Sequence, residues 1–318
     1  MSLLTKRVNL ALIIVIFLIV PRCESAQYLY PDPEISTQSM EATVRYLTTM
    51  IPFRNYAQLV SMERSAVYIS KKLSGYGLKS TKQEFIVNGK HYVNVVASVG
   101  PQEGSHLIVG AHYDVFGDQP GADDNASGIA GLIEVARFAK KHESELKFRV
   151  DIVAYALEEP PFFGTASMGS YVHAEYLHRN NVKVKGMICL DSIGFFTEEK
   201  DSQTYPLGIL RIFYPSRGNF IGVVGNWGSS ALVNQVAKHM RNNSIVVETL
   251  KAPSFIRGMV IADHRNYWKF GYDAVMVTDS AFYRNKNYHK KSDTMDTLSF
   301  PKMQEVVKGV CWALLNIN

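Results

Sequence analysis

Short apolar runs alternate with amphipathic segments along most of this 318-residue chain. The apolar runs predict strands, and apolar residues spaced three and four positions apart predict helices. Predicted strands are 106–112, 148–157, 185–191, 220–225, 245–249 and 273–278, and predicted helices are 127–141, 165–178, 229–241, 264–270 and 301–315. This alternation predicts an α/β fold of three layers (αβα), with helices covering both faces of a mixed, mostly parallel central sheet.

The segment before residue 100 has a different pattern. Two helices are predicted at 36–50 and 56–73, and a hairpin is predicted over 81–98. Asn88-Gly89 at the centre of the hairpin is a strong signal for a two-residue turn. We therefore expect two helices and a pair of antiparallel strands to precede the alternating part of the chain.

The N-terminal residues are typical of a targeting segment. Lys6 and Arg7 precede an apolar run over 8–20, and small or polar residues follow it. The run is shorter than the roughly 20 residues of a spanning helix, which disfavours an uncleaved membrane anchor. We therefore predict a signal peptide over 1–25, export to the periplasm or the medium, and a single catalytic domain over 26–318.

Composition excludes some classes of function. The formal net charge is +5, and no long basic stretch is interleaved with aromatic residues, so a nucleic-acid partner is not expected. After removal of the signal peptide, Cys189 and Cys311 are the remaining cysteines, and both lie in apolar segments. We expect them to be buried thiols rather than a disulfide. Composition leaves the oligomeric state open.

Ionisable residues follow the apolar run 107–111 directly. His112 and Asp114 come first, and Asp123 and Asp124 follow a short loop later. Unpaired charge is too costly at the end of a buried strand to be tolerated without compensation, and a cation is the simplest compensation. This segment therefore indicates one half of a metal site.

The other half is expected at the ends of later predicted strands. Carboxylates and histidines occur there at Glu158-Glu159, Asp191, Asp263-His264 and Tyr288-His289. Imidazole and carboxylate ligands from separate segments suit zinc, and the surplus of acids allows two ions bridged by a carboxylate. Successive side chains of an extended backbone point to opposite sides, so one glutamate can bind metal while its neighbour acts as a general base.

In this order and spacing, these motifs resemble those of the co-catalytic dizinc aminopeptidases of the bacterial leucyl-aminopeptidase and aminopeptidase S type. The resemblance extends from about Asn94 to the end of the chain. It implies a zinc-exopeptidase fold, two zinc ions per chain, and a peptide or small aminoacyl substrate. It also implies a metal-dependent exopeptidase that cleaves N-terminal peptide bonds.

The resemblance further implies a role for each matching residue. His112 and Asp191 would complete one metal site, Glu159 and His289 the other, and Asp124 would bridge the two. Glu158 would be the general base, and Asp114 would orient the ring of His112. The peptide bond Asp124–Asn125 would be cis.

The chain departs from some relatives at the residue that stabilises the oxyanion. Where some members of the family carry this tyrosine, four residues before Asp263-His264, the chain has Met259. Other members place it directly before the last metal histidine, and Tyr288 occupies that position, so Tyr288 is expected to take this role. The bulky run 160–163 is expected to narrow the substrate pocket.

Structural interpretations compete with the functional ones at two positions. Asp123 is more simply explained as a turn or helix-capping residue than as a ligand. Asp263 is either the N-cap of a helix or a residue that supports the metal site from behind. At the level of the whole protein, the alternatives are an exported glutaminyl cyclase with one zinc ion and a non-catalytic binding module on a peptidase fold.

Overall fold

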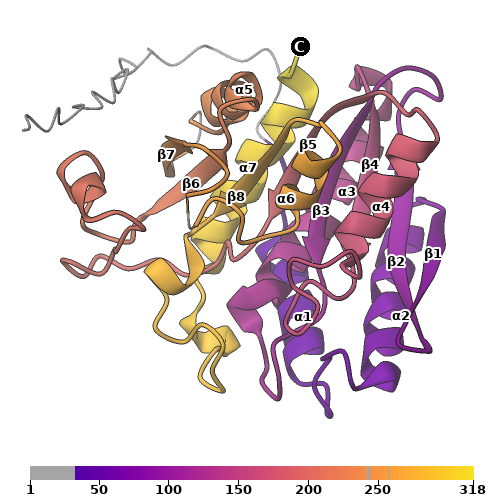
Figure 1. Cartoon of the computed structure of the whole chain (residues 1–318), viewed down its shortest axis with the longest axis horizontal. Coiled ribbons are helices and arrows are strands. Elements are labelled where there is room, and N and C mark those ends of the chain that lie inside the picture. Colours follow the sequence, from indigo (N-terminus) through magenta and orange to yellow (C-terminus); the bar gives the residue numbers. More distant parts are fainter. Residues whose placement is uncertain (1–32, 242–243, 257) are drawn as a thin grey trace, which may run out of the picture.

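The computed structural model describes residues 33–241, 244–256 and 258–318 of the chain (Figure 1). The predicted signal peptide, residues 1–25, lies outside these described residues. Within them, no helix is long and apolar enough to cross a membrane.

The described residues form one eight-stranded sheet, which confirms the predicted strands to within a few residues. The strands are β1 (Ser80–Val87), β2 (Lys90–Val99), β3 (His106–His112), β4 (Arg149–Tyr155), β5 (Val184–Leu190), β6 (Phe220–Gly225), β7 (Val246–Lys251) and β8 (Ala274–Thr278). Their order across the sheet is β1-β2-β4-β3-β5-β8-β6-β7. The central strands β4, β3, β5 and β8 are parallel, and antiparallel pairs join β1 to β2, β2 to β4 and β6 to β8.

Helices cover both faces of this sheet, which confirms the three-layer αβα architecture (Figure 1). The helices are α1 (Thr37–Thr48), α2 (Leu59–Gly75), α3 (Gly128–Lys141), α4 (Gly169–Arg179), α5 (Ser230–Met240), α6 (His264–Lys269) and α7 (Phe300–Asn316). One layer contains α1, α2, α3, α5 and α7, which contact one another, and the other contains α4 and α6. The connection between β5 and β6 includes a short 3-10 helix, Gly208–Ile212.

Strand β3 is buried on both faces because its side chains alternate between two hydrophobic cores. Leu107 and Val109 belong to the larger core, whereas Ile108 belongs to the smaller core beneath α4 and α6. Gly110 allows the close approach of the Tyr155 ring, since a Cβ at this position would lie 2.3 Å from it. The ligand-bearing end of β3 is therefore held on a rigid, fully packed support.

One helix begins later than predicted, and both cysteines are as expected. Helix α4 begins at Gly169 rather than at residue 165, because residues 162–168 form turns in which the backbone N–H of Thr165 donates to the carbonyl of Phe162. Cys189 and Cys311 are buried free thiols, as expected from their apolar surroundings.

Candidate metal centre

The carboxyl ends of neighbouring parallel strands bring the predicted site residues together. His112 ends β3, Asp191 directly follows β5, and Glu158 and Glu159 lie just beyond β4. Because β3 lies between β4 and β5, these side chains converge at one edge of the sheet. This edge is where ligands bind in open α/β sheets.

His112 lies among carboxylates from three different segments. Its Nε2 is 3.2 Å from Asp124 Oδ1, 3.6 Å from Asp191 Oδ2 and 3.9 Å from Glu158 Oε2. The side chains of His112, Asp124 and Asp191 are all buried. Ligand atoms from these three residues lie within 4.8 Å of one another, which is compatible with coordination of a single ion.

A second group of donors forms around His289. Its Nε2 is 3.1 Å from Asp124 Oδ2 and 3.2 Å from Glu159 Oε2. The two oxygens of Asp124 thus face different histidines, His112 on one side and His289 on the other. The ring of Phe116 stacks on His289 with centroids 4.3 Å apart and limits the movement of the imidazole.

The segment that carries Asp124 has an irregular backbone. Gly121 has a φ of 60°, a left-handed conformation that favours glycine, and the Asp124–Asn125 peptide bond is cis as expected. The side chain of Asn125 donates to the carbonyl of Leu190 and accepts from the backbone N–H groups of Gly128 and Ser192. Asn125 therefore ties the Asp124 segment to the end of β5.

Asp114 contacts more of the site than the sequence indicated. Its Oδ1 lies 3.5 Å from Nδ1 of His112, consistent with the expected contact. Its two oxygens also accept hydrogen bonds of 3.1 Å from the backbone N–H groups of Glu158 and Glu159. One carboxylate thus positions both a histidine and the adjacent glutamates.

The donor atoms at this centre fit a divalent cation. Several of them are buried and have no hydrogen-bond partner, including Asp124 Oδ2, Glu158 Oε1, Glu159 Oε1 and His289 Nε2. Buried polar atoms are rarely left unsatisfied in folded proteins. Carboxylate oxygens and imidazole nitrogens are ligands that zinc accepts.

Electrostatics lead to the same conclusion. Burial, together with the neighbouring Asp124 carboxylate, raises the pKa of Glu159 to about 8. Burial also raises the pKa of Glu158 well above its usual range, and the adjacent Glu159 carboxylate adds to the effect. For Asp124, burial alone would raise the pKa, but the close imidazoles of His112 and His289 hold it well below its usual range. Mutually repelling buried acids retain protons that a bound cation would replace.

Tyr288 and Asp263 both lie beside these donors. The Tyr288 ring stacks on His289 with centroids 3.9 Å apart, and burial and the Asp124 carboxylate raise the pKa of its hydroxyl. Asp263 is fully buried at the start of α6 but makes no capping hydrogen bond. Burial raises the pKa of Asp263 to about 7, against the opposing effect of His112.

The capping interpretation of Asp123 is wrong. Its Oδ1 accepts from the backbone N–H of Gly194 and its Oδ2 accepts from the Asn285 side chain. Asp123 therefore connects the loops after β5 and β8 and does not cap α3. The reason is the irregular backbone of the segment Ala122–Ser127: Asp124 and Asn125 have non-helical φ and ψ angles, and this kink separates Asp123 from the start of α3.

Two supporting residues were not found from the sequence. The carboxylate of Asp293 accepts hydrogen bonds from the backbone N–H groups of Asp123 and Asp124. Arg54, which is fully buried, donates to the carbonyls of Leu47, Pro120 and Gly121. Asp293 lies in the Ser-Asp-Thr sequence just after His289, a signal that could have been used, whereas nothing near Arg54 points to the site.

Comparison with known proteins identifies the family. The model of Peptidase family M28 matches residues 94–313. The chain belongs to this family. Membership confirms the predicted aminopeptidase-type hydrolase and the resemblance inferred from the motifs, and M28 peptidases use zinc. Arg54 lies outside the matched range.

Several relatives and solved structures are similar to this M28 peptidase. Uncharacterized protein YfbL of Escherichia coli K12 is 44% identical over 290 residues, with 88% of each chain covered. A probable leucine aminopeptidase of Arthroderma otae is 26% identical, covering 87% of this chain and 72% of the relative.

Two solved structures share the fold at lower identity. The aminopeptidase LapA of Legionella pneumophila has a TM-score of 0.69 and 19% identity, covering 88% of this chain and 72% of LapA. A glutaminyl cyclase of Bacteroides thetaiotaomicron has a TM-score of 0.67 and 17% identity, covering 91% of this chain and all of the cyclase.

Proposed function

We propose that the protein is an exported aminopeptidase that holds two zinc ions and hydrolyses N-terminal peptide bonds. The observation that carries this proposal is the pair of donor groups that share Asp124, one with His112 and Asp191 and the other with Glu159 and His289. A site for one ion would need only one of these groups. The export component depends on the N-terminal sequence alone.

In this proposal, the five ligands are His112, Asp124, Glu159, Asp191 and His289. Zinc bound there would supply Lewis-acid polarisation of the scissile carbonyl and would lower the pKa of water at the site. The α-amine of a peptide needs a nearby anion or metal, and the proposed site would offer both, which favours substrates with a free N-terminus.

Glu158 moves the proton in this mechanism. Its Oε1 is buried without a hydrogen-bond partner, and its Oε2 lies 3.9 Å from Nε2 of His112, at the edge of the ligand set. From this position Glu158 accepts a proton from the attacking water and then delivers it to the departing amine. The Asp114 carboxylate accepts a hydrogen bond from the backbone N–H of Glu158 and so holds the backbone that carries the base.

Tyr288 stabilises the negative charge that develops on the carbonyl oxygen. The stack with His289 holds its ring beside the ligands, and its protonated hydroxyl donates a hydrogen bond to the oxyanion. Asp263, at the start of α6, supports the ligands without binding the metal itself.

The decisive experiment measures metal content and activity together in the wild type and in Glu158→Gln. We expect two zinc ions per chain in both proteins, with aminopeptidase activity on aminoacyl substrates reduced at least about 1,000-fold in the variant. Normal turnover by the variant would exclude Glu158 as the base. One firmly bound zinc ion with cyclisation of N-terminal glutamine would favour a glutaminyl cyclase, and a folded protein that binds no zinc would favour a binding module.

A further inference from the structure

Arg265 occupies an unusual position next to the proposed general base. It is the second residue of α6, and its guanidinium lies over the ring of Phe163 at 4.9 Å from the centroid. Its Nη1 also approaches Gly164 so closely that a Cβ at Gly164 would be 3.2 Å away. Phe163 and Gly164 belong to the loop that continues from Glu158 and Glu159, so Arg265 contacts the segment that carries the base.

Apart from its contact with the Phe163 ring, the Arg265 guanidinium has no direct partner in the described part of the chain. Within the part of the chain that the structure describes, no carboxylate is within ion-pair distance of its guanidinium, and none of its side-chain nitrogens donates a hydrogen bond. Burial lowers its pKa, and the carboxylate of Glu158 acts in the opposite direction. A half-buried guanidinium with all its donors free is prepared to bind an anion.

The surroundings keep Arg265 in place. The neighbouring Asn266 donates from its side chain to Ser170 Oγ at 2.8 Å and to the sulfur of Met168 at 3.2 Å. The backbone N–H of Gly164 donates to the same sulfur. These bonds join α6, the start of α4 and the Phe163 loop, so little further ordering is needed before a ligand binds.

The proposed mechanism decides which part of a substrate faces Arg265. Glu158 delivers a proton to the departing amine, so the leaving residue must lie on the Glu158 side of the ligand set. Arg265 contacts the Phe163–Gly164 loop that continues from Glu158, so it places positive charge on that side. When the substrate is a dipeptide, the leaving residue carries a free α-carboxylate two bonds from the amine nitrogen.

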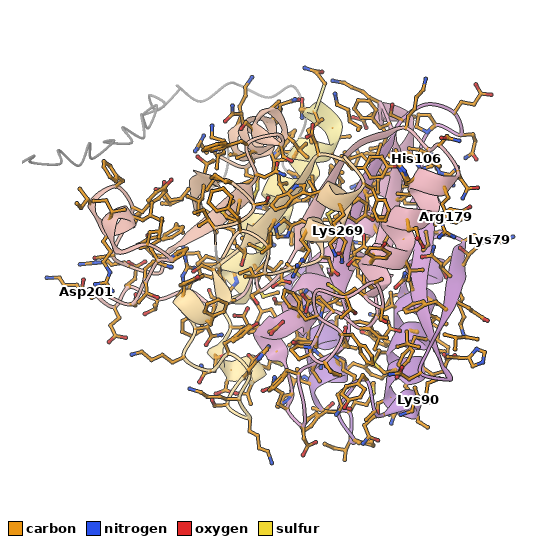
Figure 2. The ribbon with its side chains drawn as sticks, viewed as in Figure 1. Lys79, Lys90, His106, Arg179, Asp201 and Lys269 are labelled. Carbon is orange, nitrogen blue, oxygen red and sulfur yellow. The ribbon has the colours of Figure 1, made fainter. Side chains whose placement is uncertain are left out.

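We propose that Arg265 binds the α-carboxylate of the leaving residue and gives this enzyme a preference for dipeptides. This inference rests on the proposed aminopeptidase function. A guanidinium binds a carboxylate through two parallel N–H···O hydrogen bonds, and the Arg265 guanidinium makes no hydrogen bond in the described part of the chain. Lys269, one helical turn further along α6 and labelled in Figure 2, adds positive charge on the same side.

The test compares three substrates that differ in whether, and where, the leaving residue carries a carboxylate. Leucyl-leucine carries an α-carboxylate, leucyl-leucinamide carries none, and leucyl-glutamate α-amide carries one on its side chain. For Arg265→Met we expect kcat/KM for leucyl-leucine to fall about 10- to 100-fold, mainly through KM, because a charge-assisted hydrogen-bond pair is lost. We expect less than about 3-fold change for the two amides, and partial recovery for leucyl-leucine in Arg265→Lys.

Two controls separate this role from a structural one. Arg179→Met removes an exposed arginine of α4 that pairs with Glu175 and should leave all three substrates unchanged. Zinc content and thermal unfolding of Arg265→Met should match those of the wild type. An equal loss on all three substrates would overturn the proposal, and a loss confined to leucyl-glutamate α-amide would reassign Arg265 to an acidic side chain.

Binding provides a readout that does not depend on turnover. Calorimetric titration of zinc-loaded Glu158→Gln should give tighter binding of leucyl-leucine than of leucyl-leucinamide, and adding Arg265→Met should remove the difference. If the wild type hydrolyses none of the three substrates, the proposed function fails. The titration still tests Arg265, because equal affinities for the two ligands would overturn its role as a carboxylate-binding residue.

Discussion

The backbone N–H of Asp124 donates a hydrogen bond of 3.2 Å to the carboxylate of Asp293, a residue 169 positions further along the chain. The other oxygen of the same carboxylate accepts from the backbone N–H of Asp123 at 2.9 Å. Asp293 lies just after His289, so this single side chain fixes the distance between the proposed bridging ligand and the last histidine ligand.

Replacing Asp293 should therefore weaken metal binding without removing a ligand. In Asp293→Asn the amide can accept only one of the two hydrogen bonds, and its NH2 group faces a backbone donor. We expect zinc affinity to fall about 10- to 100-fold, as is usual when a residue that orients metal ligands is lost. Competition with a chelator measures this change. Asp296→Asn, an exposed neighbour, is the control, and an unchanged zinc affinity in Asp293→Asn would contradict the assigned role.

Asp114 should act on turnover as well as on metal binding. Its two oxygens hold the backbone N–H groups of Glu158 and Glu159, and Asn at this position can satisfy only one of them. For Asp114→Asn we expect kcat/KM to fall about 10- to 100-fold. The exposed Asp118 provides the matched control Asp118→Asn. Equal kinetics in the two variants would show that the Asp114 hydrogen bonds do not position the glutamates.

Arg54 should contribute mainly to stability. Arg54→Met leaves the carbonyls of Leu47, Pro120 and Gly121 buried without their donor, at a cost of about 1–3 kcal/mol for each unsatisfied group. We expect the free energy of unfolding to decrease by roughly 2–5 kcal/mol, measured by denaturant titration. Zinc affinity should also fall, because Gly121 begins the segment that carries Asp124. The exposed Arg64 gives the control Arg64→Met, and equal stability of the two variants would refute the prediction.

Tyr288→Phe should lower kcat while leaving zinc in place. The variant keeps the ring that stacks on His289 and removes only the hydroxyl. We expect kcat to fall about 100- to 1,000-fold, the usual effect of removing one oxyanion donor. Tyr176→Phe, an exposed site on α4, serves as the control. If Tyr288→Phe retained full kcat, the oxyanion donor would have to be another group.

Metal removal should make stability depend on pH. In the metal-free protein, burial raises the pKa of Glu159 and of Asp293 to about 8. Acids whose folded-state pKa is raised bind more protons in the folded than in the unfolded chain, so their stabilising effect is present at low pH and is lost as pH rises through about 8. Between pH 7 and 9 these two acids should lower the free energy of unfolding of the metal-free protein by roughly 2–4 kcal/mol. His289 acts in the same direction, because burial is outweighed by the Asp124 and Glu159 carboxylates, which raise its pKa to about 10.

The same pH range should have little effect on the zinc-loaded protein. Bound metal keeps its ligand Glu159 deprotonated, and its positive charge lowers the pKa of Asp293, which contacts the Asp124 backbone, so neither acid gains or loses a proton on unfolding. Thermal unfolding of both forms at pH 7, 8 and 9 measures the difference. The histidines with a lowered pKa, His173 and His264, are neutral in folded and unfolded chains over this range and do not contribute. Parallel pH profiles of the two forms would contradict the prediction.

The sequence predicted the site best where an ionisable residue ends an apolar run that predicts a strand. Apolar runs ending in His112 and Asp191 placed these residues at strand ends, and parallel strands bring such ends to one edge. Periodicity could not give the direction of β6, which runs antiparallel to β8, because alternating burial is the same in both directions.

The supporting residues could not be predicted for a related reason. Arg54 and Asp293 act through backbone groups of a distant segment, and backbone groups carry no sequence signal. The error at Asp123 has the same origin, since the direction of its side chain is set by the local backbone rather than by its residue type.

The order of strands in the sheet has a consequence for how the centre assembles during folding. His112, Asp124 and Asp191 are carried by β3, the segment after it and β5, and β3 and β5 pair directly. His289 follows β8, which pairs with β5 on its other side. A folding chain in which β8 has not yet docked therefore already presents one complete donor group, while the other still lacks its histidine. If the centre holds two zinc ions as proposed, we expect them to be acquired in sequence, with the first ion in place before the last strand of the parallel core docks.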